Sequence, residues 1–367
     1  MATLADPRID FTRVDHPAPT SAAARAQAIA DPGFGKVFTD HMVTIEWSDG
    51  RGWHDATIGP RGPLTLDPAA AVLHYAQEIF EGLKAYRLAE GAMALFRPDE
   101  NARRFNASAD RLAMPNLPEE TFVEAVRQLV EADREWFPTV EGGSLYLRPF
   151  MFASEAFLGV RPAKQYKFLV IASPAGNYFK SGVPAVSIWV SQDYTRAAPG
   201  GTGAAKCGGN YAASLVPHAA AVARGFDQVC FLDAAEHQWI EELGGMNVFF
   251  AFDDGTLVTP PLGGTILPGI TRDSLIRLAR DEGLDVREER YSFGQWRADS
   301  ASGRLVECFA CGTAAVVTPI GRVASDDGEF TVGGGGPGQL TTRLRSRLVA
   351  IQRGEAEDKY GWVTRLS

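Results

Sequence analysis

A glycine-rich stretch between residues 200 and 211, GGTGAAKCGGNY, contains a single charged side chain, that of Lys206. Five glycines in this stretch weaken any helix or strand and allow a ligand to approach the backbone closely. Small, uncharged neighbours also desolvate an amine, which lowers its pKa toward the nucleophilic neutral form. The pattern admits three interpretations: a phosphate-binding loop, a nucleophilic lysine, or a lysine in a solvated turn.

The spacing excludes the nucleotide loops. A Walker A loop has glycine directly before its lysine and serine or threonine directly after it. Ala205 and Cys207 occupy these positions here, so the hydroxyl that would hold magnesium is absent. The order of the glycines does not fit the strand-to-helix context of a dinucleotide fingerprint either. A reactive amine and an ordinary surface lysine both remain open on composition alone.

The pair Cys308 and Cys311 has the C-x-x-C spacing of redox and zinc sites. A zinc site needs further cysteines or histidines at ligand spacing, and the other cysteines and the six histidines do not provide it. The surrounding segment, VECFACGTAAVV, is typical of a buried strand that runs into a turn. We therefore predict a structural role for both cysteines and no metal site.

The bulk composition is that of an ordinary globular protein. The chain has 367 residues, 45% of them hydrophobic and 22% charged, a length that suits two domains. A net charge of -9 without a basic block argues against a nucleic-acid partner. No apolar run approaches the roughly 20 residues that span a bilayer, and the N-terminus lacks the apolar core of a secretory signal. We expect a cytoplasmic protein with no membrane partner.

The first half of the sequence predicts an α/β (α+β) domain over residues 1–175. Strands are expected at 40–47 and in SLYLRPFMF and QYKFLVIASPA. The segment 118–137 predicts a helix from apolar residues at helical spacing. The segment 71–86 also begins with a helical pattern, which Gly82 should break.

The second half predicts a larger domain over 187–367, joined by a glycine-rich linker at 176–186. AVSIWVS and QVCFLD should be strands, and HQWIEELGGMNVFFAF a strand, a turn and a strand. ASLVPHAAAVARG should be a helix interrupted by Pro217. Two more helices are expected at 271–283 and at about 339–352.

Eight segments together resemble the signature series of the branched-chain amino acid aminotransferases, which are pyridoxal-phosphate enzymes of fold type IV. They occur in the family's order between residues 34 and 364. They are GKVFTDHM, LHYAQEIFEGLKAY, LFRPDENARRF, SLYLRP, GTGAAKCGGNYAAS, IEELGGMNVFF, LPGITRDSL and CFACGTAAVV. The resemblance implies a two-domain fold like that of D-amino acid aminotransferase, with the Schiff-base lysine in the C-terminal domain.

The resemblance implies roles toward pyridoxal 5'-phosphate. Lys206 matches the lysine that forms the internal aldimine and then shuttles the proton. Glu242, preferred over its neighbour Glu241, should keep the cofactor's ring nitrogen protonated. Tyr211 should donate a hydrogen bond to the phenolate oxygen. The groups expected to hold the phosphate are Arg104, preferred over Arg103, the helix start at Gly269, Ile270 and Thr271, and Thr313.

The resemblance also implies a pocket that accepts an aliphatic side chain in one half-reaction and that of glutamate in the other. Tyr146 and Arg148 should receive the glutamate carboxylate, and the backbone of Thr313 and Ala314 the α-carboxylate. The expected apolar walls are Phe34, Tyr75, Phe80 and Tyr178. Leu158 and Val160 resemble residues that reach the pocket from a second subunit, which implies a homodimer.

Two features depart from relatives in this family. Some members have a redox-sensing C-x-x-C where Ala315 and Thr318 stand here, so that regulation should be absent. Gly245 replaces a threonine that lines the site in some relatives. The implied reaction is ping-pong transamination between leucine, isoleucine or valine and 2-oxoglutarate. The alternatives on the same fold are a D-amino acid aminotransferase and an aminodeoxychorismate lyase.

Overall fold

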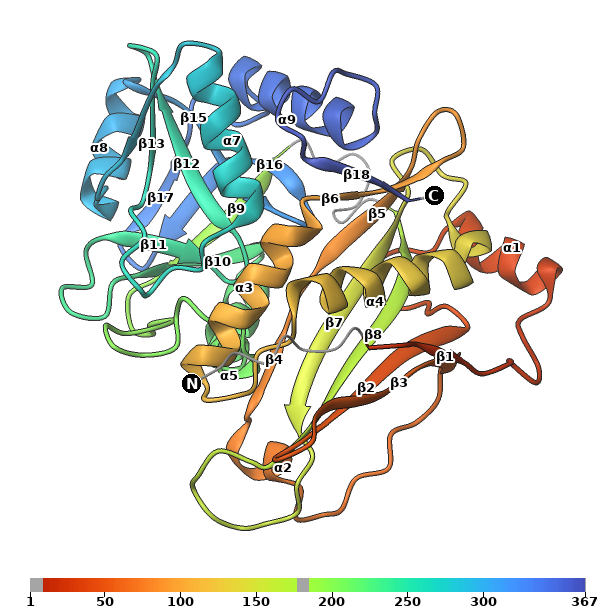
Figure 1. Ribbon diagram of the computed structural model, residues 1–367. Helices are drawn as coiled ribbons and strands as arrows, with labels where there is room; N and C mark the ends of the chain where they lie inside the picture. The colour runs from red at the N-terminus through yellow and green to blue at the C-terminus, as the bar shows by residue number, and fades with distance from the viewer. Residues whose placement is uncertain (1–8, 177–184, 367) are drawn as a thin grey trace. The chain divides into compact units, whose positions relative to one another are not determined.

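The computed structural model describes residues 9–176 and 185–366, which form two compact units. The first unit comprises 9–176, 205–208 and 352–366, and the second comprises 185–204 and 209–351. Each unit contains a nine-stranded sheet within the described ranges (Figure 1). No helix in these ranges is long and apolar enough to cross a membrane. Most of the expected linker, 176–186, lies outside the described residues.

Two short segments from the second half of the chain belong to the first unit. Ala205 and Cys207, on either side of Lys206, are buried in its apolar core. Strand β18 (Val363–Leu366) pairs antiparallel with β6 (Met93–Phe96). The boundaries expected from the sequence differ here, because they placed both segments in the C-terminal domain. Contacts between residues so distant in sequence leave no local pattern.

The sheet of the first unit is almost wholly antiparallel, with one parallel pair at its edge. Its strands are, in spatial order, β1 (Thr12–Arg13), β3 (Gly52–Pro60), β2 (His41–Ser48), β8 (Gln165–Ala175), β7 (Ser144–Ala153), β5 (Leu83–Arg87), β6 and β18, with β4 (Glu78–Phe80) beside β7. Helix α4 (Glu119–Ala132) packs on β2, β7 and β8 (Figure 1). Its buried residues, from Phe122 to Val130, recur at the predicted helical spacing, which confirms that helix. Also present are α1 (Ala22–Ala30), α2 (Ala71–Tyr75), α3 (Pro98–Arg111) and η1 (Arg134–Trp136).

The sheet of the second unit mixes parallel and antiparallel pairs. Its strands are, in spatial order, β11 (Ile240–Leu243), β10 (Gln228–Leu232), β9 (Val186–Ser191), β16 (Val316–Ser325), β15 (Leu305–Gly312), β12 (Asn247–Phe252), β13 (Thr256–Thr259) and β14 (Asp285–Glu288), with β17 (Gly328–Thr331) beside β16. The remaining helices are α5 (Gly208–Ala212), α6 (Leu215–Ala223), α7 (Ile270–Asp281), α8 (Phe293–Ser302) and α9 (Gln339–Gln352). The predicted strands and the two C-terminal helices are confirmed.

Two predictions about helices are wrong. The helical pattern of 71–86 ends at Tyr75, because Ala76 adopts a left-handed conformation with φ of 48°, and the chain continues as β4 and β5. Pro217 does not interrupt α6. It lies in the first turn of that helix, where the backbone N–H has no intrahelical partner and proline is therefore tolerated.

Cys308 and Cys311 lie on a buried strand, as the sequence predicts. Both are buried and free on β15. Burial raises the pKa of each thiol well above its usual range, so neither is a thiolate at neutral pH. The described residues contain no group of three or more histidine, cysteine or carboxylate side chains that could hold a metal ion.

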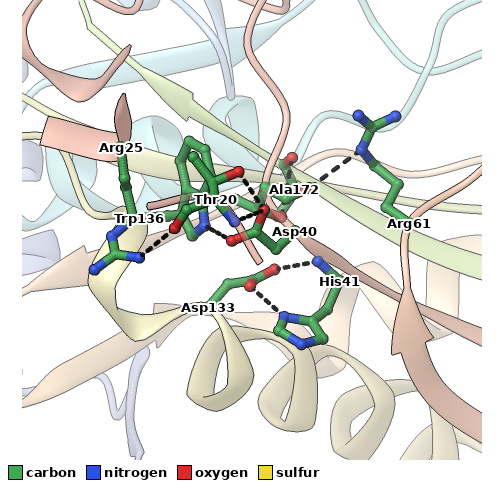
Figure 2. Close-up of polar contacts among 9 residues, drawn as sticks. Thr20, Arg25, Asp40, His41, Arg61, Asp133, Trp136 and Ala172 are labelled. Carbon is green, nitrogen blue, oxygen red and sulfur yellow. Dashed lines mark hydrogen bonds and ion pairs between the residues drawn. The ribbon is translucent and has the colours of Figure 1, made fainter. Parts of the chain in front are cut away.

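Two carboxylates tie the N-terminal region to the first sheet and to the end of α4 (Figure 2). Thr20 donates a hydrogen bond from Oγ1 to Asp40 Oδ1 at 2.6 Å, and Trp136 donates from Nε1 to Asp40 Oδ2 at 3.1 Å. His41 Nδ1 lies 2.7 Å from Asp133 Oδ1, and the Asp133 side chain is almost fully buried. Loss of the His41 charge therefore removes the ion pair of a buried carboxylate and leaves it with hydrogen bonds alone, one of them from the His41 backbone N–H at 3.2 Å.

We expect the stability of the first unit to decrease as pH rises above neutral. The hydrogen bond from His41 to Asp133 raises the pKa of His41 above its ordinary 6.5. A raised histidine pKa stabilises the fold fully below the unfolded-state value, and this contribution is lost as pH rises through the folded-state value. Melting temperatures between pH 6 and 9 should fall more steeply for the wild type than for Asp133→Asn. Parallel curves for the two proteins would contradict this account.

Candidate active site

The backbone of Lys206 is held by two other elements of the first unit. Its N–H donates to Ser108 Oγ on α3 at 2.9 Å. Its carbonyl accepts from the N–H of Phe80 on β4 at 2.9 Å. The lysine segment therefore owes its position to tertiary hydrogen bonds and to its buried neighbours.

At two positions of the glycine-rich stretch a side chain would collide with other parts of the protein. A Cβ on Gly203 would lie 2.4 Å from the carbonyl oxygen of Thr265, which is backbone and cannot easily move. A Cβ on Gly208 would lie 2.1 Å from Glu78 Oε1. The glycines were expected to admit a ligand. At these two positions the missing side chain instead leaves room for the Thr265 carbonyl oxygen and the Glu78 carboxylate.

A buried carboxylate that the sequence reasoning did not single out organises the surroundings of Lys206. Glu81 accepts hydrogen bonds from Arg104 Nε at 2.7 Å and Nη2 at 2.8 Å, and from Asn101 at 2.7 Å. Burial alone would raise the pKa of Glu81, but the charges of Arg104 and Lys206 and these hydrogen bonds lower it overall. Glu81 is therefore ionised and holds the Arg104 guanidinium in place.

Arg104 and its neighbour Arg103 differ in burial and in their ion pairs, in line with the preference for Arg104 in the sequence prediction. The Arg104 side chain is buried, whereas that of Arg103 is 49% exposed and forms ion pairs with Asp99 and Glu100. The Nζ atom of Lys206 lies 5.0 Å from the ring centroid of Phe80, the residue next to Glu81. The predicted Schiff-base lysine and phosphate-binding arginine thus both interact with the charge of one carboxylate, that of Glu81.

Four of the predicted pocket residues form a cluster in the first unit. The rings of Phe34 and Tyr146 meet edge to face at 4.9 Å between centroids. Arg148 donates from Nη2 to the Tyr146 hydroxyl at 3.0 Å, and its guanidinium lies 4.7 Å from the centroid of Phe80. Gly82 makes room for this arrangement, because a Cβ there would lie 2.1 Å from Tyr146 Oη.

The alternation of side chains along a strand explains why Tyr146 and Arg148 lie side by side on one face of β7. Successive side chains of a strand point to opposite faces, so residues 146, 148 and 150 of β7 share one face. The alternate residues Leu147 and Met151 are fully buried in the apolar core. Arg148 Nε is buried and has no hydrogen-bond partner among the described residues. An arginine so placed is available to an anionic ligand.

Three other predicted pocket residues, Tyr75, Leu158 and Val160, do not join this cluster in the described part of the chain. Tyr75 is 40% exposed and its ring lies 6.5 Å from that of Phe157. Leu158 is 71% exposed and Val160 is 92% exposed. Tyr178 lies outside the described residues. Exposed apolar side chains that lie together in one patch can mark an interaction surface, whereas single ones are ordinary.

In the second unit, Glu242 has the character expected of a fixed anion. It lies on β11, is 2% exposed, and its Oε2 is 3.2 Å from Arg196 Nη1 and 3.0 Å from the N–H of Leu267. Its neighbour Glu241 points to the other strand face and accepts a hydrogen bond from Thr265 Oγ1 at 2.6 Å. Burial raises the pKa of Glu241.

The start of α7 is the predicted anion site of the second unit. Gly269 is its N-cap, with no hydrogen bond from a side chain, and Ile270 and Thr271 form the first turn. The N–H groups of a first turn and the helix dipole together favour an anion. Asn247 Nδ2 supports the approach to this turn by donating to the carbonyl of Leu267 at 3.1 Å.

The remaining predicted cofactor and carboxylate contacts lie in other segments of the same unit. Thr313 and Ala314 are partly buried in the turn between β15 and β16. Tyr211 lies on α5, and a Cβ added to Gly245 would be 3.8 Å from Tyr211 Cε1. Gly245 therefore leaves open space beside the Tyr211 ring.

Comparison with known proteins shows the family of this chain. Residues 78–323 match the amino-transferase class IV family. A probable branched-chain-amino-acid aminotransferase of Streptomyces coelicolor is 56% identical over 99% of this chain and 100% of its own. The solved branched-chain amino acid aminotransferase of Escherichia coli has a TM-score of 0.73 and 30% identity over 88% of this chain and 99% of its own. That of Thermobaculum terrenum, solved in its PLP-form, has a TM-score of 0.70 and 25% identity over 89% of this chain and 98% of its own.

The match to the Streptomyces coelicolor relative extends over 99% of this chain and so over both units, whereas the family model leaves out Phe34 and Tyr75. The comparisons also agree with the mixed α/β architecture predicted from the sequence. This chain is therefore an enzyme of the class IV aminotransferases and belongs to the branched-chain-amino-acid aminotransferase family.

Proposed function

We propose that this enzyme transfers the amino group between leucine, isoleucine or valine and 2-oxoglutarate by a ping-pong route with pyridoxal 5'-phosphate. The observation that carries the proposal is the cluster of Lys206, Phe80, Tyr146 and Arg148 in one unit. It combines an amine, an apolar aromatic surface and a cation. Transamination between an aliphatic and a dicarboxylic amino acid needs these three features.

The donor set of each unit fits the cofactor. When bound, pyridoxal phosphate supplies an electron sink for the substrate's α-carbon. The first unit offers an amine on Lys206 and the oriented guanidinium of Arg104, and the second offers the buried carboxylate of Glu242 and the start of α7. These groups match an aldehyde, a phosphate and a ring nitrogen in chemical type.

Each residue then has a defined task. Lys206 holds the cofactor and moves the proton at the α-carbon. Glu242 keeps a proton on the ring nitrogen, while Tyr211 donates a hydrogen bond to the phenolate oxygen. The phosphate is bound by Arg104, Ile270, Thr271 and Thr313. The backbone of Thr313 and Ala314 binds the α-carboxylate of the substrate.

The side-chain pocket has to serve two kinds of substrate. Phe34 and Phe80 offer aromatic surface to an aliphatic chain, and Tyr146 with Arg148 offers donors to a carboxylate. The exposure of Tyr75, Leu158 and Val160 supports a homodimer in which Leu158 and Val160 complete the pocket of the partner subunit. Tyr178 is assigned to the apolar wall on the family resemblance alone.

The proposal predicts that Arg148→Met raises the KM for 2-oxoglutarate by roughly 10- to 100-fold, the range expected for losing a charge-assisted contact to the substrate. The KM for leucine should change much less, because an apolar chain makes no ion pair with Arg148. Steady-state kinetics with varied leucine and varied 2-oxoglutarate would measure both values. Arg51→Met is a matched control, since Arg51 is exposed and pairs with Asp55.

A substrate panel separates the proposal from the alternatives on the same fold. Leucine with 2-oxoglutarate should react, whereas D-alanine and aminodeoxychorismate should not. Preferential turnover of D-alanine, or lyase activity on aminodeoxychorismate, would overturn the proposed substrate class.

A further inference from the structure

Glu78 lies on the same sheet face as the side-chain pocket. It is two residues before Phe80 on β4, so both side chains point the same way. β4 pairs with β7 in the register Glu78 to Phe152 and Phe80 to Phe150. One face of β7 carries the side chains of residues 146, 148, 150 and 152. Because Glu78 is paired with Phe152, its carboxylate lies on this same face, together with Tyr146 and Arg148.

Glu78 is partly buried beside the lysine segment and interacts with the charge of Arg148. Its Oε1 accepts a hydrogen bond from the N–H of Gly208, two residues after Lys206. Burial has the largest effect on the pKa of Glu78 and raises it overall, while the Gly208 N–H and the charge of Arg148 act in the opposite direction. Glu78 and Arg148 form no direct ion pair in the described part of the chain. Arg148 Nε still has a buried, unused donor there.

This arrangement suits a pocket with two kinds of substrate. A full positive charge that faces an aliphatic side chain is costly to desolvate, and a nearby carboxylate lowers that cost. The same carboxylate repels the side-chain carboxylate of a dicarboxylic substrate. A carboxylate on the same sheet face that forms no ion pair with Arg148 offsets its charge without occupying its donors.

We propose that Glu78 is a specificity-determining residue, which offsets the charge of Arg148 and so sets the balance between dicarboxylic and branched-chain substrates. The inference rests on the proposed function, in which Arg148 receives the side-chain carboxylate of glutamate or 2-oxoglutarate. Glu78 acts through the field at Arg148 and through no contact of its own with the reacting atoms.

Glu78→Gln tests this because the carboxamide oxygen can still accept from Gly208 while the charge is lost. The KM for 2-oxoglutarate should fall roughly three- to tenfold, as expected for removing one like charge from the pocket. The KM for leucine should stay the same or rise, with kcat little changed. Calorimetric binding of glutarate to the holoenzyme should tighten by the same factor, and this readout does not depend on turnover.

A double-mutant cycle with Arg148→Met identifies the partner of Glu78. The effect of Glu78→Gln on the KM for 2-oxoglutarate should be clearly smaller in the Arg148→Met background, because the part that acts through Arg148 is lost and only the direct repulsion of the substrate remains. Glu78→Asp, which restores the charge, should keep the wild-type preference. Glu46→Gln is the matched control, since Glu46 lies on β2 of the same sheet and pairs with Lys167.

The outcomes distinguish this inference from the proposed function. If Arg148→Met leaves the KM for 2-oxoglutarate unchanged, the proposed function of Arg148 is wrong. If Arg148→Met raises that KM but Glu78→Gln does not lower it, or lowers it equally in both backgrounds, the inference about Glu78 is wrong. If Glu78→Gln fails to fold while Glu78→Asp folds with an altered substrate preference, the inference is likewise wrong.

Discussion

Lys206→Ala is expected to lower kcat for leucine transamination by roughly four orders of magnitude, the upper range for loss of a positioned proton-transfer group. Hydrogen bonds to Ser108 and Phe80 fix the backbone of Lys206 and so the point from which its side chain extends. Borohydride treatment of the wild type, followed by peptide mapping, should find the cofactor attached to Lys206. The variant should show no attached cofactor.

A conservative variant separates chemistry from folding. Lys206→Arg keeps the positive charge near Glu81 and should retain the wild-type melting temperature, yet it should be as inactive as Lys206→Ala because a guanidinium is always protonated. Lys164→Ala is the control, since the Lys164 side chain is 63% exposed. Attachment of the cofactor to any other lysine would overturn the assignment.

Glu242→Gln has the second largest expected effect, a loss of roughly 10²- to 10³-fold in kcat, which is typical for removing one electrostatic partner of a reacting system. A neutral amide at this position cannot hold a proton on the ring nitrogen of the cofactor. The change also leaves the buried Arg196 without its carboxylate, so the melting temperature should fall as well. Single-turnover kinetics with leucine would measure the chemical step directly.

Glu241→Gln provides a sharp comparison, because the two residues are adjacent and differ in the strand face to which they point. The bond to Thr265 can be kept by the amide oxygen, and we expect less than about a threefold change in kcat, as is usual for substitutions that remove no catalytic charge. A larger loss of activity from Glu241→Gln than from Glu242→Gln would reverse the assignment made from the sequence.

The sequence by itself determined much of the chemistry. Residue types and spacing around Lys206 excluded a nucleotide loop, and the eight ordered segments indicated the enzyme family and fold that the comparisons confirmed. Long periodic segments such as α4 and α9 were also predicted correctly. The residues within each segment are enough to indicate its apolar face or its ends. Where a tertiary contact overrides local preference, as between 76 and 87, the prediction failed.

The tertiary structure alone decided how these residues are held. The bonds of Lys206 join it to residues 98 and 126 positions earlier in the chain, and its four-residue segment belongs to the first unit for this reason. Glu81 and Glu78 are ordinary carboxylates in the sequence; one becomes the buried partner of Arg104 and the other shares a sheet face with Arg148. Burial and charge pairing depend on which strands become neighbours, and strand pairing is a property of the whole chain that no local pattern encodes.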